Sequence, residues 1–384
     1  MRKWTLALGV LVLLALVALW QLSQKTPAQR DGGAEAWLSS ALKGGEHLLR
    51  ALDAQGKFNY LYDAKTGESS SSYNNLRHSG AAYALLQLYE VTGRREFLEG
   101  AQSAIQYLVN AFVKPCDFKG QSLLCAVEDG EVKLGGNALA VIAMVKYTAI
   151  TQDDQYLETA IRLGRWMQLT QDETGRFTVH IQLYPTSWVT GFVSGYYPGE
   201  AMLALLRLYQ LTHEVSWLDT ASRAADYLIR VRDGEKTIEE LDHDHWLLIS
   251  LNELHRQRPE QAFLDHALKL FEAIEQGQNK GPQNPLWLGS WYTPPRSTPA
   301  STRVEGLVAA YQLVRDFKPE AAAPILRAAK LGGAFILKNQ LSQEDNVQPL
   351  GWGGFRESLD GYELRIDYTQ HAVSALLGLH QITQ

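Results

Sequence analysis

Residues 138–167 read ALAVIAMVKYTAITQDDQYLETAIRLGRWM, in which two apolar segments flank a polar turn at residues 151–154. Apolar side chains recur every three to four residues in both segments, which is typical of amphipathic helices. Two such helices joined by a short polar turn form an antiparallel hairpin. The first segment is richer in alanine and nearly free of polar residues, so we expect its helix to lie inside the fold and the second to cover it.

The hairpin pattern recurs along the chain. Four further stretches show it, and one single helical segment is added at each end: 83–110, 201–229, 246–274, 306–337, 34–52 and 369–379. The total is twelve helices in six hairpins. Turns within hairpins are short and connections between hairpins are long, so all long connections lie at one end. We expect an all-α, closed (α/α)6 toroid over residues 34–384, rather than an open superhelix, with its functional surface at that end.

The composition narrows the possible functions. Hydrophobic residues make up 46% and charged residues 20% of the 384 residues, which is ordinary for a globular domain. The net charge of −6 and the lack of a Lys/Arg run give no basis for nucleic-acid binding. The sequence also lacks a glycine-rich phosphate loop and a Cys/His zinc set, so we expect neither a cofactor nor a metal ion.

The N-terminus has the pattern of a membrane segment. Arg2 and Lys3 precede the uncharged stretch 4–20, which spans roughly 25 Å as a helix, near the short limit for crossing a bilayer. We expect residues 1–23 to be an uncleaved anchor in the inner membrane and 24–33 to be a polar linker, with a periplasmic body. The alternative is a cleaved signal peptide and a secreted or periplasmic protein.

The chain has two cysteines, Cys116 and Cys125, nine residues apart in one long connection. Outside the cytoplasm a disulfide is the default state of such a pair. Closing a loop of this size stabilises the fold by roughly 2.5–3 kcal/mol on the chain-entropy model. We therefore predict that the two cysteines are bonded.

Polar residues gather where the inner helices are expected to begin. They are Asn75 and Arg77, Asn137, Tyr197 and Glu200, Asp242 and His245, Arg303 and Glu305, and Arg365 and Asp367. Capping accounts for Asn and Asp, and in Asp242-His243-Asp244-His245 we expect one capping Asp and one pocket-facing His. Capping does not account for arginine at three entries, because a helix N-terminus disfavours cations. An anionic ligand held by guanidinium groups and helix dipoles would explain them, although Arg–Glu and Arg–Asp ion pairs are the structural alternative.

Aromatic residues are frequent in the long connections, and Trp291 is the one that we select as a sugar-stacking residue. Aromatic rings in a groove bind the apolar faces of sugars while polar neighbours bind the hydroxyl groups. The alternative is that these rings pack the connections onto the barrel.

The segment Arg365-Ile366-Asp367-Tyr368-Thr369-Gln370-His371 resembles the Arg-x-Asp-Tyr-x-x-His segment of the D-glucuronyl C5-epimerases. The resemblance implies an (α/α) barrel that works on polysaccharide uronates, with Tyr368 at the position of a catalytic tyrosine. Residues 194–209 are similar in style to that family's entry into an inner helix, but Glu200 stands where a Gln is expected. The family's β-rich N-terminal portion has no counterpart here.

These features together favour a carbohydrate-active enzyme of the cell envelope that acts on an acidic polysaccharide. For uronate C5-epimerase or lyase chemistry, Asn75 and the arginines would neutralise the carboxylate, and Tyr368, His78 and His371 would transfer the proton. One alternative is an inverting glycoside hydrolase, with Glu200 as general acid and a second carboxylate across the mouth. Another alternative is a non-catalytic glycan-binding or polysaccharide-assembly subunit.

Overall fold

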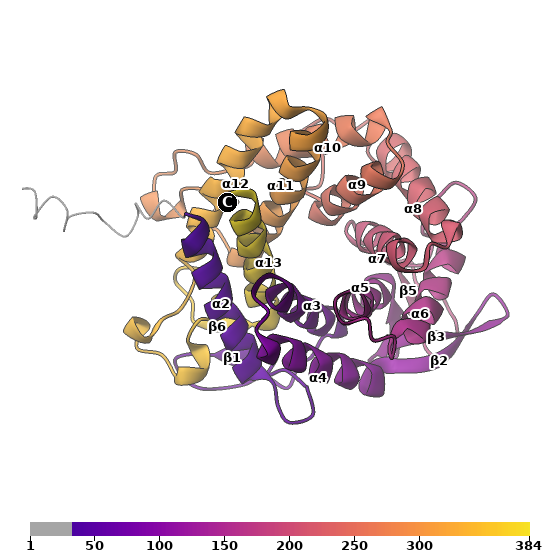
Figure 1. Cartoon of the computed structure of the whole chain (residues 1–384), viewed down its shortest axis with the longest axis horizontal. Coiled ribbons are helices and arrows are strands. Elements are labelled where there is room, and N and C mark those ends of the chain that lie inside the picture. Colours follow the sequence, from indigo (N-terminus) through magenta and orange to yellow (C-terminus); the bar gives the residue numbers. More distant parts are fainter. Residues whose placement is uncertain (1–32) are drawn as a thin grey trace, which may run out of the picture. The chain divides into compact units, whose positions relative to one another are not determined.

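Twelve α-helices form two concentric rings in the computed structural model, which describes residues 33–384 (Figure 1). The predicted anchor and nearly all of the linker lie outside the described residues. The inner ring consists of α3 (Asn75–Thr92), α5 (Leu134–Thr151), α7 (Tyr197–Thr212), α9 (His245–Gln257), α11 (Ser297–Phe317) and α13 (Ile366–Ile382). The outer ring consists of α2 (Ala34–Ala51), α4 (Arg95–Phe112), α6 (Leu157–Thr170), α8 (Val215–Tyr227), α10 (Gln261–Gln276) and α12 (Ala322–Leu337).

The inner ring is closed. Each inner helix packs against the next one in the chain, and α13 packs against both α3 and α2, so the last helix joins the first two. The prediction of six hairpins in an (α/α)6 toroid is confirmed. The predicted entry of α11 was placed too late, because the helix begins at Ser297 and Arg303 lies in its second turn.

Burial follows the predicted division between the two rings. Among the described helices, α5 alone is long and apolar enough to cross a membrane, but 78% of its apolar window is buried inside the barrel.

Glycines on the outer helices let the two rings approach closely. A Cβ at Gly333 of α12 would lie 2.4 Å from the Leu379 side chain of α13, and one at Gly164 of α6 would lie 2.5 Å from Leu208 of α7.

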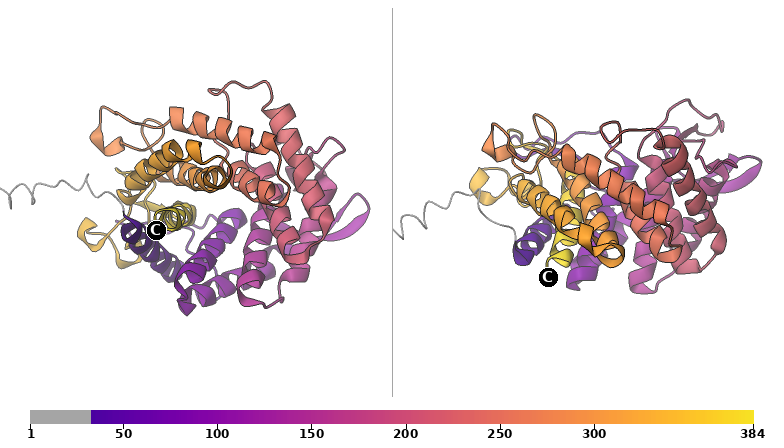
Figure 2. Two further views of the ribbon diagram at one scale, coloured as in Figure 1. Left: turned by 45° about the horizontal axis from the view of Figure 1, so that its top comes forward. Right: turned by 90° about the horizontal axis from the view of Figure 1, so that it is seen from above.

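The long connections gather on one side of the ring and carry short strands (Figure 2). A four-stranded antiparallel sheet has the order β2 (Val113–Phe118), β3 (Gln121–Glu128), β4 (Glu131–Lys133), β5 (Ile181–Leu183). A two-stranded sheet pairs β1 (Leu61–Asp63) with β6 (Glu363–Arg365). The expectation of an all-α chain is corrected to a mostly helical one. The missed signal was Asp129-Gly130, both with positive φ, because such a pair is a strong hairpin turn signal.

The predicted disulfide is confirmed. Cys116 in β2 and Cys125 in β3 are bonded, with their Cα atoms 5.9 Å apart. The bond therefore joins the two strands of a hairpin rather than the ends of an irregular loop.

Four long connections begin with the same local structure. The chain turns after the outer helix, and an aromatic residue pairs back onto the helix end by an isolated bridge and is buried: Phe58, Phe177, Trp291 and Phe355. Trp291 is 1% exposed, and its Nε1 donates to the carbonyl of Ile274 at 2.7 Å. The structure therefore places Trp291 in the core and not in a sugar-binding groove.

Candidate functional site

A cavity of about 510 Å³ opens among the long connections and the N-terminal ends of the inner helices. We call it the mouth cavity. Its lining residues with polar or aromatic side chains include Arg77, Tyr196, Tyr197, Glu200, His245, Trp246, Tyr292, Arg303, Asp367, Gln370 and His371. These residues come from α3, α7, α9, α11, α13 and the connections before α7 and α11. The predicted location of the site, at the long-connection end, coincides with this cavity.

Two histidines that line the mouth cavity, His245 and His371, lie close to the carboxylate of Glu305. Nδ1 of His371 lies 2.9 Å from Oε2 of Glu305, and Nε2 of His245 lies 3.8 Å from the same oxygen. The two imidazole rings are edge to face, with centroids 5.7 Å apart. His245 makes no hydrogen bond through either ring nitrogen to the described residues. Both nitrogens are buried, so the imidazole has unused hydrogen-bonding capacity beside the mouth cavity.

The environment shifts the pKa values of the two histidines in opposite directions. Burial and the neighbouring charges of His371 and Arg303 hold the pKa of His245 well below 6.5. Burial also acts to lower the pKa of His371, but the Glu305 carboxylate outweighs it and raises that pKa. Burial raises the pKa of Glu305 against the opposing charge of His371. The Glu305 carboxylate therefore favours the protonated form of His371, while burial favours the neutral form of His245.

The same three residues could hold a metal ion. Each offers one ligand atom, and these atoms all lie within 4.8 Å of one another. Two histidines and one glutamate are a donor set that divalent metals use. The expectation of no metal ion stays a prediction.

Arg303 is a buried cation without a carboxylate partner among residues 33–384. It is 4% exposed, and its guanidinium donates to Nδ1 of His243 at 2.8 Å, to the carbonyl of Pro299 at 2.9 Å and to the hydroxyl of Tyr292 at 2.5 Å. The alternative of an Arg303–Glu305 ion pair is not realised. A buried charge is costly unless it is paired, so an anionic ligand group in the mouth cavity would complete this site.

The other two arginines share one carboxylate. Asp367 is 4% exposed and accepts from Arg365 at 2.5 and 3.0 Å, while Nε of Arg77 lies 3.4 Å from it. Arg77 also donates to the hydroxyl of Tyr60 and lines the mouth cavity, whereas Arg365 does not line it. Arg365 therefore forms the ion pair with Asp367 that was the structural alternative to ligand binding.

Glu200 lies in the first turn of α7 and is 5% exposed, and its Oε2 has no hydrogen-bond partner among the described residues. Burial, together with the charge of Asp244, raises its pKa to about 8. A Cβ at Gly135 would lie 2.2 Å from Oε2, so only a glycine at position 135 leaves room for this carboxyl group. Glu200 is a protonated acid at neutral pH that faces the mouth cavity.

Several predicted site residues lie outside the lining of the mouth cavity and have structural partners. His78 is fully buried between the hydroxyl of Tyr73 and the carbonyl of Ala104. The hydroxyl of Tyr368 donates to Glu363 at 3.0 Å. Sequence spacing placed both residues at a helix entry. It could not show that their side chains point away from the mouth cavity.

The remaining three predicted residues support local structure. The backbone N–H of Asn75 donates to Oε1 of Glu128, and the Asn137 side chain accepts from the backbone N–H of Ala126. The Asp242 side chain is exposed and lies 3.4 Å from Nζ of Lys236. Helix α9 is instead capped by Asp244, while His245 faces the cavity. The structure thus shows the expected division between one capping Asp and one pocket-facing His.

Four further lining residues were not selected as site residues from the sequence: Tyr196, Trp246, Tyr292 and Gln370. Tyr292 has a positive φ of 67°, an uncommon conformation that directs its ring toward Arg303, 4.8 Å from centroid to guanidinium. Trp246 packs against His245, with ring centroids 4.9 Å apart. Two signals could have found them: position within the predicted helix entries, and, for Tyr292, the aromatic residues of the long connections.

No protein-family model matches the chain. A search of curated proteins finds no match either. Solved structures that share the fold include a D-mannose isomerase, with a TM-score of 0.66 and 14% identity over 91% of this chain and 97% of that one. The cellobiose 2-epimerase from Bacillus thermoamylovorans B4167 has a TM-score of 0.68 and 12% identity, covering 91% of this chain and 100% of that one.

An alpha-1,6-mannanase from Salegentibacter sp. HEL1_6 is similar as well, with a TM-score of 0.65 and 15% identity over 91% of this chain and 100% of that one. At such low identity these likenesses establish the (α/α)6 toroid and nothing finer. The resemblance of residues 365–371 to the glucuronyl C5-epimerases is not tested by them.

Proposed function

We propose that the chain is a sugar epimerase or isomerase that moves a proton on a carbon next to a carbonyl or carboxylate group of an acidic saccharide. The observation that carries the proposal is the pair His245 and His371, which share one cavity and have pKa values shifted in opposite directions. Groups whose environments separate their pKa values are suited to act as base and acid in one reaction.

In the proposed reaction the neutral imidazole of His245 removes the proton from the carbon. Negative charge then develops on the adjacent oxygen, where a guanidinium or the protonated carboxyl of Glu200 can stabilise it. His371, charged through Glu305, returns a proton to the same carbon or to its neighbour. Return to the opposite face of the same carbon is epimerisation, and return to the neighbouring carbon is isomerisation.

Arg303 supports an acidic substrate, because this buried guanidinium lacks a carboxylate partner in the described part of the chain. The names of two similar structures, D-mannose isomerase and cellobiose 2-epimerase, support proton-transfer chemistry on a sugar in this fold. Uronate C5 chemistry through Tyr368 has less support, since that hydroxyl is bonded to Glu363 outside the mouth cavity.

The second candidate is a glycoside hydrolase, and the protonated carboxyl of Glu200 favours it, because a general acid with a raised pKa is what hydrolysis requires. The similar mannanase is described as inactive when two adjacent aspartates, at its positions 136 and 137, are replaced. No two adjacent carboxylates are among the residues that line the mouth cavity of residues 33–384. We therefore place hydrolysis second.

The test is incubation of the protein with acidic oligosaccharides in D2O, read by NMR and mass spectrometry. We expect deuterium at one carbon without loss of chain length, and the position of that carbon separates C5 chemistry on a uronate from C2 chemistry at a reducing end. His371→Asn should abolish the exchange. His213→Asn, an exposed histidine at the opposite end of the barrel, is the matched control and should not change it.

Three other outcomes would overturn the proposal. New reducing ends would indicate hydrolysis, and binding without deuterium uptake would indicate a glycan-binding or assembly subunit. Loss of activity on chelation, restored by a divalent ion, would mean that His245, Glu305 and His371 act as metal ligands.

We also propose that the body lies outside the cytoplasm and is held at the inner membrane by residues 1–23. The disulfide supports this location, because such bonds persist in oxidising compartments. Alkaline phosphatase fused after Gln384 should be active in cells, and the protein should stay with the membrane after a high-salt wash. A soluble fusion that lacks the N-terminal segment would instead indicate a cleaved signal peptide.

A further inference from the structure

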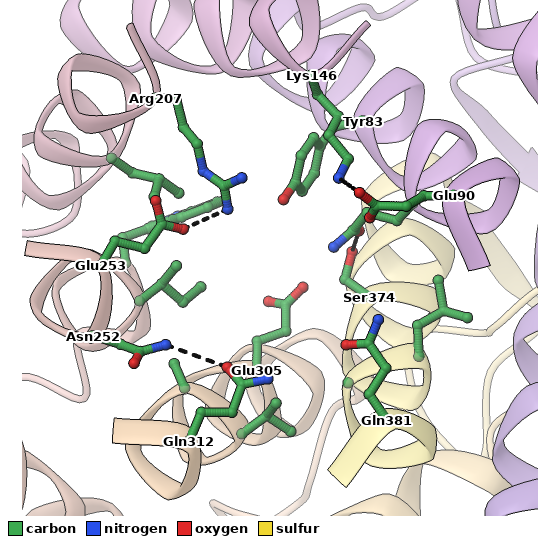
Figure 3. A pocket seen from close by; sticks show the side chains of 18 of the residues that line it. Tyr83, Glu90, Lys146, Arg207, Asn252, Glu253, Glu305, Gln312, Ser374 and Gln381 are labelled. Carbon is green, nitrogen blue, oxygen red and sulfur yellow. Dashed lines mark hydrogen bonds and ion pairs between the residues drawn. The ribbon is translucent and has the colours of Figure 1, made fainter. Parts of the chain in front are cut away.

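A second cavity, of about 320 Å³, lies at the end of the barrel where the short turns are (Figure 3). We call it the far cavity. It is lined by residues of all six inner helices, and Trp246 and Gln370 line both it and the mouth cavity. We call these two shared side chains the partition between the two spaces.

Polar side chains around the far cavity are bonded from helix to helix. We call them the belt: Glu90 with Lys146, Arg207 with Glu253, Asn252 with Gln312, and Ser374 with Gln87. These four contacts join α3 to α5, α7 to α9, α9 to α11 and α13 to α3. The belt therefore holds donors and acceptors in fixed positions on several sides of one space.

Two cationic residues of the belt, Arg207 and Lys146, are largely buried. Nε of Arg207 is buried and has no partner among the described residues, and the guanidinium extends into the cavity (Figure 3). The Lys146 side chain is 9% exposed, and burial lowers its pKa against the opposing effect of Glu90. Replacing buried ion pairs by apolar residues of similar volume is often neutral or stabilising, so helix packing alone does not require these charges.

We propose that the far cavity is a second binding site, for a neutral polyhydroxy compound of the size of a mono- or disaccharide. The charge balance selects a neutral ligand, because Lys146 and Arg207 are each matched by a carboxylate and Glu305 is matched by His371. A volume of about 320 Å³ is at the lower end of the range for small-molecule sites, about 300–1,000 Å³.

The chemistry of the walls selects a polyhydroxy compound. Each hydroxyl group needs a donor and an acceptor, and amide, carboxylate and guanidinium groups of the belt supply both. The indole of Trp246 at the partition gives an apolar face for a sugar ring. Because the belt is already ordered, binding costs little additional side-chain entropy. The proposal concerns binding alone and does not depend on the reaction in the mouth cavity.

The experiment uses the full-length protein and three probes, D-mannose, D-glucose and cellobiose, in saturation-transfer NMR and calorimetry. Ala309→Phe places a ring in the far cavity, and Thr302→Phe places one in the mouth cavity. We expect at least one probe to bind the wild type and Thr302→Phe but not Ala309→Phe. Circular dichroism and thermal melting check that both variants are folded.

A third variant keeps the test valid if Ala309→Phe does not fold. Gln381 lines the rim of the far cavity, is exposed and makes no hydrogen bond to the described residues, so Gln381→Ala should leave the fold intact. Loss of one ligand hydrogen bond should weaken probe binding about 2- to 10-fold. The proposal is overturned if no probe binds, if Thr302→Phe removes all binding, or if neither Ala309→Phe nor Gln381→Ala weakens it.

Discussion

Oε2 of Glu305, which lines the far cavity, lies 2.9 Å from Nδ1 of His371, which lines the mouth cavity. Both groups are largely buried, so each depends on the other for its charge state. Glu305 makes His371 a stronger base than burial alone would allow. Histidine protonation near neutral pH is thereby controlled by a residue on the neighbouring helix.

Glu305→Gln should lower the pKa of His371 below 6.5, because burial then acts without the opposing carboxylate. The titration of the imidazole carbons of labelled histidine, followed by NMR, measures this shift. If the proposed reaction is correct, the loss of activity at alkaline pH, where His371 gives up its proton, should move to lower pH. Glu90→Gln is the control, since Glu90 contacts Lys146 and not His371. A His371 pKa that stays above 6.5 in Glu305→Gln would contradict the assignment.

Arg303→Gln should weaken the binding of acidic oligosaccharides about 10- to 100-fold, the expected loss for hydrogen bonds to a charged group. The binding of neutral oligosaccharides should change little, and the salt dependence of acidic binding should decrease. Calorimetry at two salt concentrations measures both effects. Arg296→Gln is the control, because Arg296 also lines the mouth cavity but its side chain is 59% exposed and lies near Glu357. Equal losses for acidic and neutral ligands would refute the anion site.

Arg365→Ala should destabilise the fold by about 2 kcal/mol, since it removes two hydrogen bonds to the buried Asp367 and leaves only Arg77 beside it. Urea unfolding measures the change. Ligand binding per folded molecule should be unaltered, because Arg365 does not line the mouth cavity. A variant of unchanged stability that fails to bind acidic ligand would show that Arg365 belongs to the binding site.

The three arginines show how far sequence reasoning reaches. Helical periodicity fixes which residues occur near a helix start, so the entries of α3 and α13 were placed correctly. The direction of a side chain depends on the rotation of the helix about its axis and on neighbours distant in sequence. For Arg303, which binds His243, and Glu305, which binds His371, those neighbours are 60 and 66 residues away. The positions of the three arginines near helix entries were therefore predicted correctly. The prediction that all three line one cavity was wrong, because Arg365 is turned toward Asp367.

The missed strands and the buried aromatic residues have a common cause. Periodic helices dominate the sequence signal, so the remaining segments were treated as loops. Their structure depends on local turns such as Asp129-Gly130 and on isolated bridges that seat Trp291 against Ile274. The disulfide could be predicted because two cysteines allow only one pairing within the chain.

Replacing both cysteines by serine should lower the free energy of unfolding by about 2.5 kcal/mol, the chain-entropy value for a loop of this length. The hairpin of β2 and β3 should persist through its backbone hydrogen bonds, so the helical circular dichroism should not change. Urea unfolding of the oxidised wild type against the double variant measures the difference. An identical unfolding midpoint would show that the bond does not constrain the unfolded chain.

Glu200→Gln should make stability less dependent on pH. The folded-state pKa of Glu200 is about 8 and its ordinary value is 4.5, so the folded protein binds this proton more tightly than the unfolded chain does. This contribution is fully present below pH 4.5 and is lost as the pH rises toward 8. Glutamine mimics the protonated acid, so the melting temperature of the variant relative to wild type should increase between pH 5 and about 8. Glu158→Gln, at an exposed position of α6, is the control and should show no such trend. A constant difference across this range would mean that Glu200 is ionised in the folded protein. It could then serve as a base, but not as the general acid of hydrolysis or as the protonated carboxyl that stabilises negative charge in the proposed epimerisation.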